Sequence, residues 1–170
     1  MWSSKGRINS RRAALALLLS ASLGACGFTP VLKEGSASRA LLGTIDVDII
    51  EGRNHYEYRR ALLDQLSRPN GDAIYRLSYK MTVDETALSV STTADIERFN
   101  LIGEVEFELR VRATDDLIYQ DKIRASAGYS ATATAYPTQV AERDAIARLS
   151  RSLAELTFQR LLLNSERIIP

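Results

Sequence analysis

Few side chains in this 170-residue sequence could do chemistry. It has one histidine, His55, and one cysteine, Cys26. Metal sites and nucleophilic catalysis need such groups in clusters, and a lone histidine at the start of a helix is usually a surface residue. The motifs GxSxG, GxGxxG and the P-loop do not occur. The sequence therefore predicts no enzyme, no metal site and no bound cofactor.

Carboxylates are more plentiful, and Glu104, Glu106 and Glu108 stand at every second position. They alternate with apolar residues, which is typical of the solvated face of a strand. A pair of catalytic carboxylates is the alternative, and only the geometry of the folded chain distinguishes the two.

Cys26 follows an apolar segment near the N-terminus. Residues 1–12 contain four basic side chains and no acidic one, and residues 13–25 carry no charge. A basic start, a short apolar run and small residues at its end are typical of a secretory signal peptide. The run is shorter than the roughly 20 apolar residues that span a bilayer. We therefore predict a signal peptide over residues 1–25. A buried helix is the alternative, and Arg11-Arg12 also raises a twin-arginine signal.

The residues Leu23-Gly24-Ala25-Cys26 resemble the lipobox of bacterial lipoproteins. The resemblance implies a diacylglyceryl thioether on Cys26, cleavage before it and acylation of the new α-amine. Several acyl chains on one residue hold a protein on a membrane, whereas one chain binds only reversibly. Gly27 occupies the position where Asp commonly marks inner-membrane retention, which favours an outer-membrane address. A buried free thiol or a nucleophile are the alternatives for Cys26, and a single cysteine excludes an internal disulfide.

Processing before Cys26 changes the charge balance. The formal net charge falls from +1 to about −3 because four basic residues are removed. This argues against a nucleic-acid partner, which requires a basic surface. Residues 26–43, rich in Gly and Ser, are predicted to be the lipidated N-terminus and a tether. A single domain is expected over residues 44–164, followed by a polar C-terminal tail over residues 165–170.

Alternating apolar residues predict strands over residues 44–50, 75–84, 104–112 and 117–129. In the first of these, Ile45, Val47 and Ile49 share one face. Residues 87–102 are weaker strand material in which we expect a bulge.

Two segments have the helical period. The first covers residues 54–66, with Asn54 as its N-cap, and the second is a long helix that starts near Pro137. Their apolar stripes are Tyr58, Leu62, Leu63 and Leu66 in the first helix, and Val140, Ile146, Leu149, Leu153, Leu156 and Leu163 in the second.

The turn at Asp115-Asp116 constrains the last hairpin. The apolar residues of both flanking strands are odd-numbered, and opposed residues lie on the same face of a sheet. A two-residue loop would place basic residues in the core, so an odd loop or a bulge is expected. The predicted neighbours are Val111 with Tyr119, and Phe107 with Ile123.

The order of elements is β-α-β-β-β-α, which predicts an α+β fold. We expect a two-layer sandwich with two helices on one face of a four-stranded, mixed and mostly antiparallel sheet. If the first two strands are parallel neighbours, the helix between them forms a right-handed crossover.

The polar face of this sheet is the candidate binding surface. It carries the basic residues Arg98, Arg110, Arg112, Lys122 and Arg124, and Lys80 could join them. The planar guanidinium of arginine suits phosphate groups. The alternative is an ordinary solubilising surface, because Glu106, Glu108 and Asp121 are interleaved with these cations.

Five segments together resemble the alphaproteobacterial form of the LptE family of lipopolysaccharide-assembly lipoproteins. They are CGFTP at the lipobox, YEYRRALLDQL, RFNLIGEVEFEL, ASAGYSATATAYPTQVAERDA and the long closing helix. The resemblance covers nearly the whole mature chain. It implies two helices on one face of a small sheet, which agrees with the pattern above.

The resemblance also implies a function. The protein would plug and help assemble the outer-membrane β-barrel translocon LptD, while lipopolysaccharide passes to the outer leaflet. It would be lipid-anchored on the periplasmic side of the outer membrane, with no cofactor besides the covalent lipid. An accessory subunit of another lipid-transport or barrel-assembly complex is the competing hypothesis, and a periplasmic enzyme is a third.

Overall fold

The structure is a computed structural model that describes residues 32–69, 71–89, 96–132 and 134–169, so Cys26 and the predicted signal peptide lie outside the described residues. Four strands form one sheet in the order β1-β2-β3-β4. β1 pairs with β2 in parallel, and the other two pairs are antiparallel. The strands are β1 (Ile45–Val47), β2 (Tyr75–Ser89), β3 (Ile96–Val111) and β4 (Leu117–Thr132).

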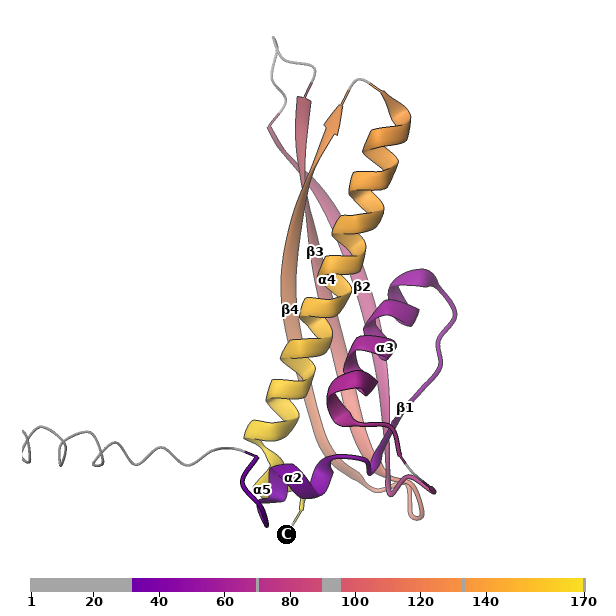
Figure 1. Cartoon of the computed structure of the whole chain (residues 1–170), viewed down its shortest axis with the longest axis vertical. Helices are drawn as coiled ribbons and strands as arrows, with labels where there is room; N and C mark the ends of the chain where they lie inside the picture. The colour runs from indigo at the N-terminus through magenta and orange to yellow at the C-terminus, as the bar shows by residue number, and fades with distance from the viewer. Residues whose placement is uncertain (1–31, 70, 90–95, 133, 170) are drawn as a thin grey trace, which may run out of the picture.

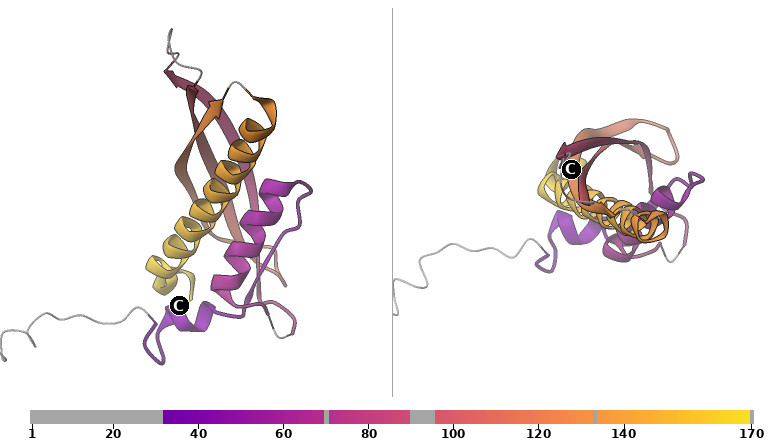
Figure 2. Two further views of the ribbon diagram at one scale, coloured as in Figure 1. Left: turned by 45° about the horizontal axis from the view of Figure 1, so that its top comes forward. Right: turned by 90° about the horizontal axis from the view of Figure 1, so that it is seen from above.

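Two helices, α3 (Arg53–Leu66) and α4 (Ala135–Leu163), lie on the same side of the curved sheet (Figures 1 and 2). The predicted α+β sandwich and its order of elements are therefore confirmed. The expected irregularity in the weaker strand is present as a register shift between Ala87 and Ser89. β1 and β2 are parallel neighbours, with α3 between them along the chain.

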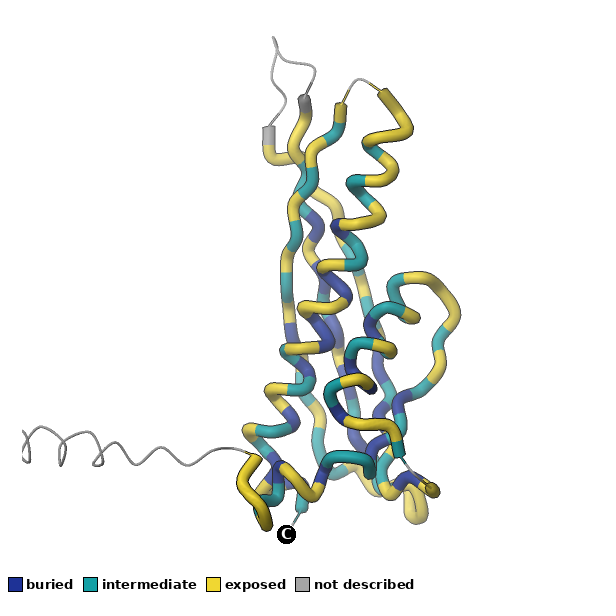
Figure 3. The backbone as a smooth tube through the Cα atoms, viewed as in Figure 1, coloured by how far each residue is buried: buried dark blue, intermediate teal, exposed yellow. Residues whose placement is uncertain are grey.

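The core forms because odd-numbered residues of the long strands face the helices. Buried and exposed residues alternate along these strands (Figure 3). Tyr79 stands opposite Phe107 and Leu77 opposite Leu109, so apolar pairs meet across the strands. The largest fully buried side chains of the sheet are Ile45, Val47, Leu77, Phe107 and Leu109.

The helices bury the stripes that the sequence predicts, with exceptions at the ends of α4. Tyr58, Leu62, Leu63 and Leu66 of α3 are all buried. In α4, Leu149 and Leu153 are buried, but Val140 is 47 % exposed and Leu163 is 73 % exposed. Val140 lies before Ala145, the first buried residue of this 29-residue helix. Leu163 lies on another face of the helix than Leu161, which is fully buried two residues earlier.

Two boundaries differ from the prediction. β1 ends at Val47, and Ile49 is 81 % exposed rather than part of the buried face. Helix α3 begins one residue before Asn54, so Asn54 is not its N-cap. The N-cap is Gly52, whose φ of 123° is a conformation that side chains other than glycine rarely adopt.

The last hairpin contains the expected bulge, but the predicted pairs are wrong by two residues. Tyr119 stands opposite Leu109, and Ile123 stands opposite Val105. Between Leu109 and Arg110 the register shifts, so Ile118 is the extra residue of β4. The turn itself is closed by a hydrogen bond of 2.9 Å from the amide of Val111 to the carbonyl of Asp116.

The ends of the described chain pack together at one end of the molecule. Helix α2 (Ala37–Leu41) buries Leu41 completely, and helix α5 (Ser165–Ile168) buries Ile168. The hydroxyls of Ser38 and Ser165 are 2.8 Å apart in a buried hydrogen bond. Residues 37–43 and 165–168, which the sequence assigned to the tether and the tail, therefore belong to the packed structure. We call this junction the α2–α5 clasp.

Candidate functional site

The face of the sheet that points away from α3 and α4 gathers most of the predicted binding residues. Between the two register shifts, its side chains are the even-numbered residues of β2, β3 and β4, because successive residues of a strand point to opposite faces. Cross-strand pairs on this face join Glu104 with Arg124 and Glu106 with Lys122. The paired strands therefore place acids of β3 directly beside bases of β4.

Glu104 lies at the centre of this charge network. One of its carboxylate oxygens pairs with the Nζ of Lys122, and the other is 2.5 Å from the Nε of Arg124. The same Nζ is 3.0 Å from Oε1 of Glu106. Hydrogen bonds from Lys122 and Arg124 lower the pKa of Glu104, and the bonds to Glu104 and Glu106 raise the pKa of Lys122. Both shifts favour the charged forms, the carboxylate of Glu104 and the ammonium group of Lys122.

The lowered pKa of Glu104 gives a pH-dependent prediction. A carboxylate with a depressed pKa stabilises the folded state above the ordinary value of 4.5, and this stabilisation is lost as the pH falls through the folded-state pKa. We expect carbon-13 NMR to show Glu104 titrating below 4.5. In the variant Lys122→Met with Arg124→Gln, the midpoint should rise toward 4.5. An unchanged midpoint would show that the pairs do not hold the charge.

A second group of charges lies at the turn end of β3. Arg110 is 2.7 Å from Oε2 of Glu108 and also donates to the carbonyl of Asp115 at 3.0 Å. The bond to Glu108 raises the pKa of Arg110. Arg112 is 3.6 Å from Asp46, which links this group to β1. These two cations are therefore compensated by acids, as Lys122 and Arg124 are.

Arg98 is set apart from the other candidates. It stands opposite Ser130, whereas Arg110 stands opposite Leu117 at the other end of the same two strands. A strand rises about 3.3 Å per residue, so the twelve residues between them span about 40 Å. Arg98 is exposed and forms no ion pair with another residue in the described ranges. The structure thus brings Lys122 and Arg124 together and places Arg98 and Arg110 near opposite ends of β3.

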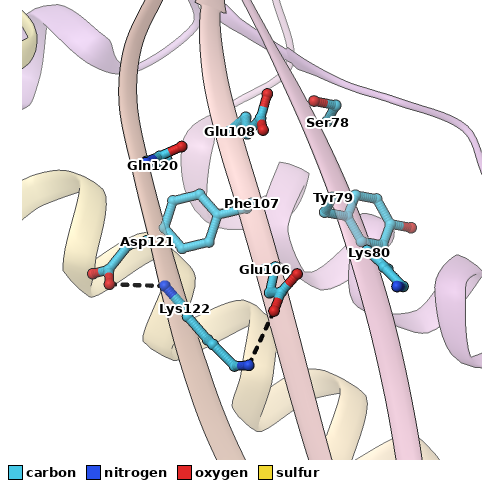
Figure 4. A pocket seen from close by; sticks show the side chains of 9 residues that line it. All are labelled: Ser78, Tyr79, Lys80, Glu106, Phe107, Glu108, Gln120, Asp121 and Lys122. Atoms are coloured by element: carbon cyan, nitrogen blue, oxygen red, sulfur yellow. Dashed lines mark hydrogen bonds and ion pairs between the residues drawn. The ribbon is translucent and has the colours of Figure 1, made fainter.

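A shallow pocket of about 670 Å³ lies on this part of the sheet (Figure 4). Lys122 bridges toward Glu106 across it (Figure 4). Ser78 and Gln120 were not among the predicted binding residues, although they alternate in phase with the charged residues and that phase places them on the same face. The pocket is lined by Ser78, Tyr79, Lys80, Glu106, Phe107, Glu108, Gln120, Asp121 and Lys122.

The chemistry available here is hydrogen bonding and charge pairing. Lys80 lines the pocket and stands opposite Glu106 across the strands, but it makes no ion pair within the described part of the chain. An anionic group would have to compete with Glu104 and Glu106 for Lys122. Among the described residues, no three side chains of the metal-binding kinds come close enough to hold an ion. None of the helices in the described ranges is both long and apolar enough to cross a membrane.

The fold is shared with solved structures of bacterial proteins. A protein named as a lipoprotein from Caulobacter crescentus is 22 % identical, with a TM-score of 0.63, over 76 % of this chain and 96 % of that one. The minor lipoprotein of Acinetobacter baumannii is 16 % identical with a TM-score of 0.52, over 73 % and 94 % of the two chains. Rare lipoprotein B of Shewanella oneidensis is 15 % identical with a TM-score of 0.51, over 72 % and 94 %.

Identities this low show the fold alone, and the comparison with curated proteins found no match. The sequence itself carries the assignment. The model of the family described as "LptE: Lipopolysaccharide-assembly" matches residues 42–161, which include all four strands, α3 and nearly all of α4. The protein therefore belongs to the LptE family of lipopolysaccharide-assembly proteins.

Proposed function

We propose that this protein is an outer-membrane lipoprotein that plugs and helps assemble an LptD-type β-barrel, and so takes part in lipopolysaccharide transport to the outer leaflet. The observation that carries the proposal is the family match over residues 42–161. In this proposal Cys26 is the lipidated residue, the protein sits on the periplasmic side of the outer membrane, and it has no catalytic role.

The charged face of the sheet supports the proposal physically. The lumen of a large membrane barrel is polar, so a domain that enters it needs a hydrated surface. Lys122 and Arg124 with Glu104 supply such a surface without a large net charge. These ion pairs balance the charges of the face and keep it polar, as a surface in contact with a hydrated lumen requires.

The experiment is a pull-down of the full-length protein from outer membranes in a mild detergent. A stoichiometric large β-barrel among the recovered proteins would support the proposal. Recovery of the protein alone, or with periplasmic partners only, would contradict it and favour an accessory subunit of another complex. Mass spectrometry of the N-terminal peptide tests the anchor separately, because a diacylglyceryl group on Cys26 changes its mass.

A charge reversal tests the basic residues directly. We expect Arg110→Glu with Arg112→Glu to weaken binding of lipopolysaccharide at least about tenfold, because each charge-assisted hydrogen bond contributes about 1.5–3 kcal/mol. Recovery of the barrel should fall as well. Binding is measured by titration with purified lipopolysaccharide.

The matched control is Arg143→Glu with Arg151→Glu, which places the same charge change on exposed positions of α4. The milder pair Arg110→Gln with Arg112→Gln separates lost contacts from new repulsion beside Glu108 and Asp46. Unchanged binding of both lipopolysaccharide and barrel in all these variants would mean that Arg110 and Arg112 only keep this face hydrated.

A further inference from the structure

A second groove, of about 480 Å³, lies next to the shallow pocket on the sheet, where the start of β4 meets the ends of α4 and α5, and Gln120 and Asp121 line both. The groove is lined by Leu117, Tyr119 and Asp121 of β4, by Arg160 of α4 and by Arg167 of α5. The α2–α5 clasp holds this end together, and the described chain also begins here, at Leu32 (Figure 1). The groove is therefore at the end from which the chain continues toward Cys26.

Two guanidinium groups dominate the charge of the groove. Arg160 is 3.7 Å from Asp121, which is a long ion pair, and Arg167 forms no ion pair with any residue that the structure describes. Asp121 also accepts hydrogen bonds from the hydroxyl of Tyr119 at 3.0 Å and from the amide of Lys122 at 2.8 Å. The lining thus contains one acidic side chain, Asp121, and two basic ones.

Tyr119 lies in the groove together with both guanidinium groups. Burial raises the pKa of Tyr119 to about 12, and the hydrogen bond to Asp121 adds to the rise. The charges of Arg160 and Arg167 oppose it. Arg160 and Arg167 come from two different helices and line the same groove as Tyr119.

Apolar surface adjoins these cations. Leu117 is 43 % exposed at the start of β4, and Ile118, the extra residue of the bulge, lines the groove beside it. Cationic groups beside exposed aliphatic side chains match a molecule that has a phosphate next to a hydrocarbon chain.

We propose that this groove binds the phosphate head group of a membrane lipid, with Arg160 and Arg167 on the phosphate and Leu117 against the start of the acyl chain. The site needs no barrel partner and does not depend on the plug function. It relies on the proposed anchor at Cys26 only for its nearness to the bilayer. Free phosphate shares the head-group chemistry, and the hydrocarbon contact distinguishes the two ligands.

The test uses the full-length protein in dodecyl maltoside, which carries no phosphate. Dihexanoyl-phosphatidylglycerol and inorganic phosphate are titrated separately by calorimetry. We expect R160Q with R167Q to weaken binding of the lipid at least about tenfold, because two charge-assisted contacts are lost. Arg167→Gln alone, which breaks no ion pair of the described fold, should give a smaller loss. Leu117→Gln should weaken the lipid and leave inorganic phosphate unchanged.

The control is Arg143→Gln with Arg151→Gln, which removes the same charge from α4 outside the groove and should leave lipid binding unchanged. Equal loss in this control would show a general charge effect and overturn the site. Lipid binding that survives R160Q with R167Q would also overturn it. If inorganic phosphate bound as tightly as the lipid, the groove would be a phosphate site, and the proposal of a lipid site would be overturned. Recovery of a barrel in the pull-down has no bearing on these outcomes.

Discussion

Replacing Gly103 by valine is expected to lower the free energy of unfolding by about 3 kcal/mol or more, which is the upper part of the usual cost of overpacking a core. Gly103 lies in β3 directly beneath α4. A Cβ atom built there would be 2.8 Å from Cδ1 of Leu153 and 3.0 Å from Cγ of Leu149. Both leucines are buried, so neither can turn toward solvent. Valine adds two further methyl groups, so α4 must move away from the sheet.

Gly128 of β4 provides the matched control. A Cβ at Gly128 would meet only the carbonyl oxygen of Phe99, at 3.5 Å, which is an ordinary contact. Gly128→Val should therefore change the midpoint of urea unfolding far less than Gly103→Val. Equal destabilisation of the two variants would mean that loss of strand glycine, rather than the close approach of α4, determines the cost.

The second large effect is expected at Thr157. This buried side chain of α4 donates to the carbonyl of Leu153 at 2.9 Å, so its only hydroxyl hydrogen is used there. The hydroxyl of Tyr58 on α3 is 2.9 Å away and must be the donor to Thr157. Thr157→Val keeps the shape but leaves the buried Tyr58 hydroxyl unpaired, which should cost about 2 kcal/mol.

Tyr58→Phe should cost less, about 1 kcal/mol, because Thr157 keeps its bond to Leu153 and no buried group is left unpaired. Urea unfolding of the two single variants and the double variant measures this asymmetry. In the double variant, the loss of unfolding free energy should be close to that of Tyr58→Phe plus the contribution of the hydrogen bond from Thr157 to the carbonyl of Leu153. If Tyr58→Phe were the more damaging change, the assignment of donor and acceptor would be reversed.

The fold was largely predictable because its long elements have clear periods. The strands around Leu77, Val105 and Ile123 alternate, and the stripe that includes Leu62 has the helical period. Ile49 was misplaced because alternation does not show where a pairing partner ends, and β1 pairs with β2 at only three positions. Helices α2 and α5 were missed because four or five residues are too few for a recognisable period.

The candidate site was predictable in composition but not in pairing. The alternation of apolar and polar residues along the strand is enough to place the even-numbered Lys122 and Arg124 on the polar face. Which acids they meet depends on the single extra residue Ile118, whose position the sequence does not reveal. The register expected from the sequence would set Glu106 opposite Arg124, whereas the folded strands set Glu104 there. The groove at Arg160 and Arg167 could not be predicted from the sequence because residues 165–170, which include α5, were expected to be a polar tail.

The α2–α5 clasp also determines how far the domain can travel from its anchor. With the lipid on Cys26 that we propose, the first residue fixed in the fold is Ser38, which is twelve residues along the chain. A fully extended chain of that length reaches about 40 Å. If the tether continued to Thr44, where the domain was expected to begin, it would reach about 60 Å. The accessible volume grows with the cube of this distance, so the clasp raises the local concentration of the domain beside its membrane roughly threefold.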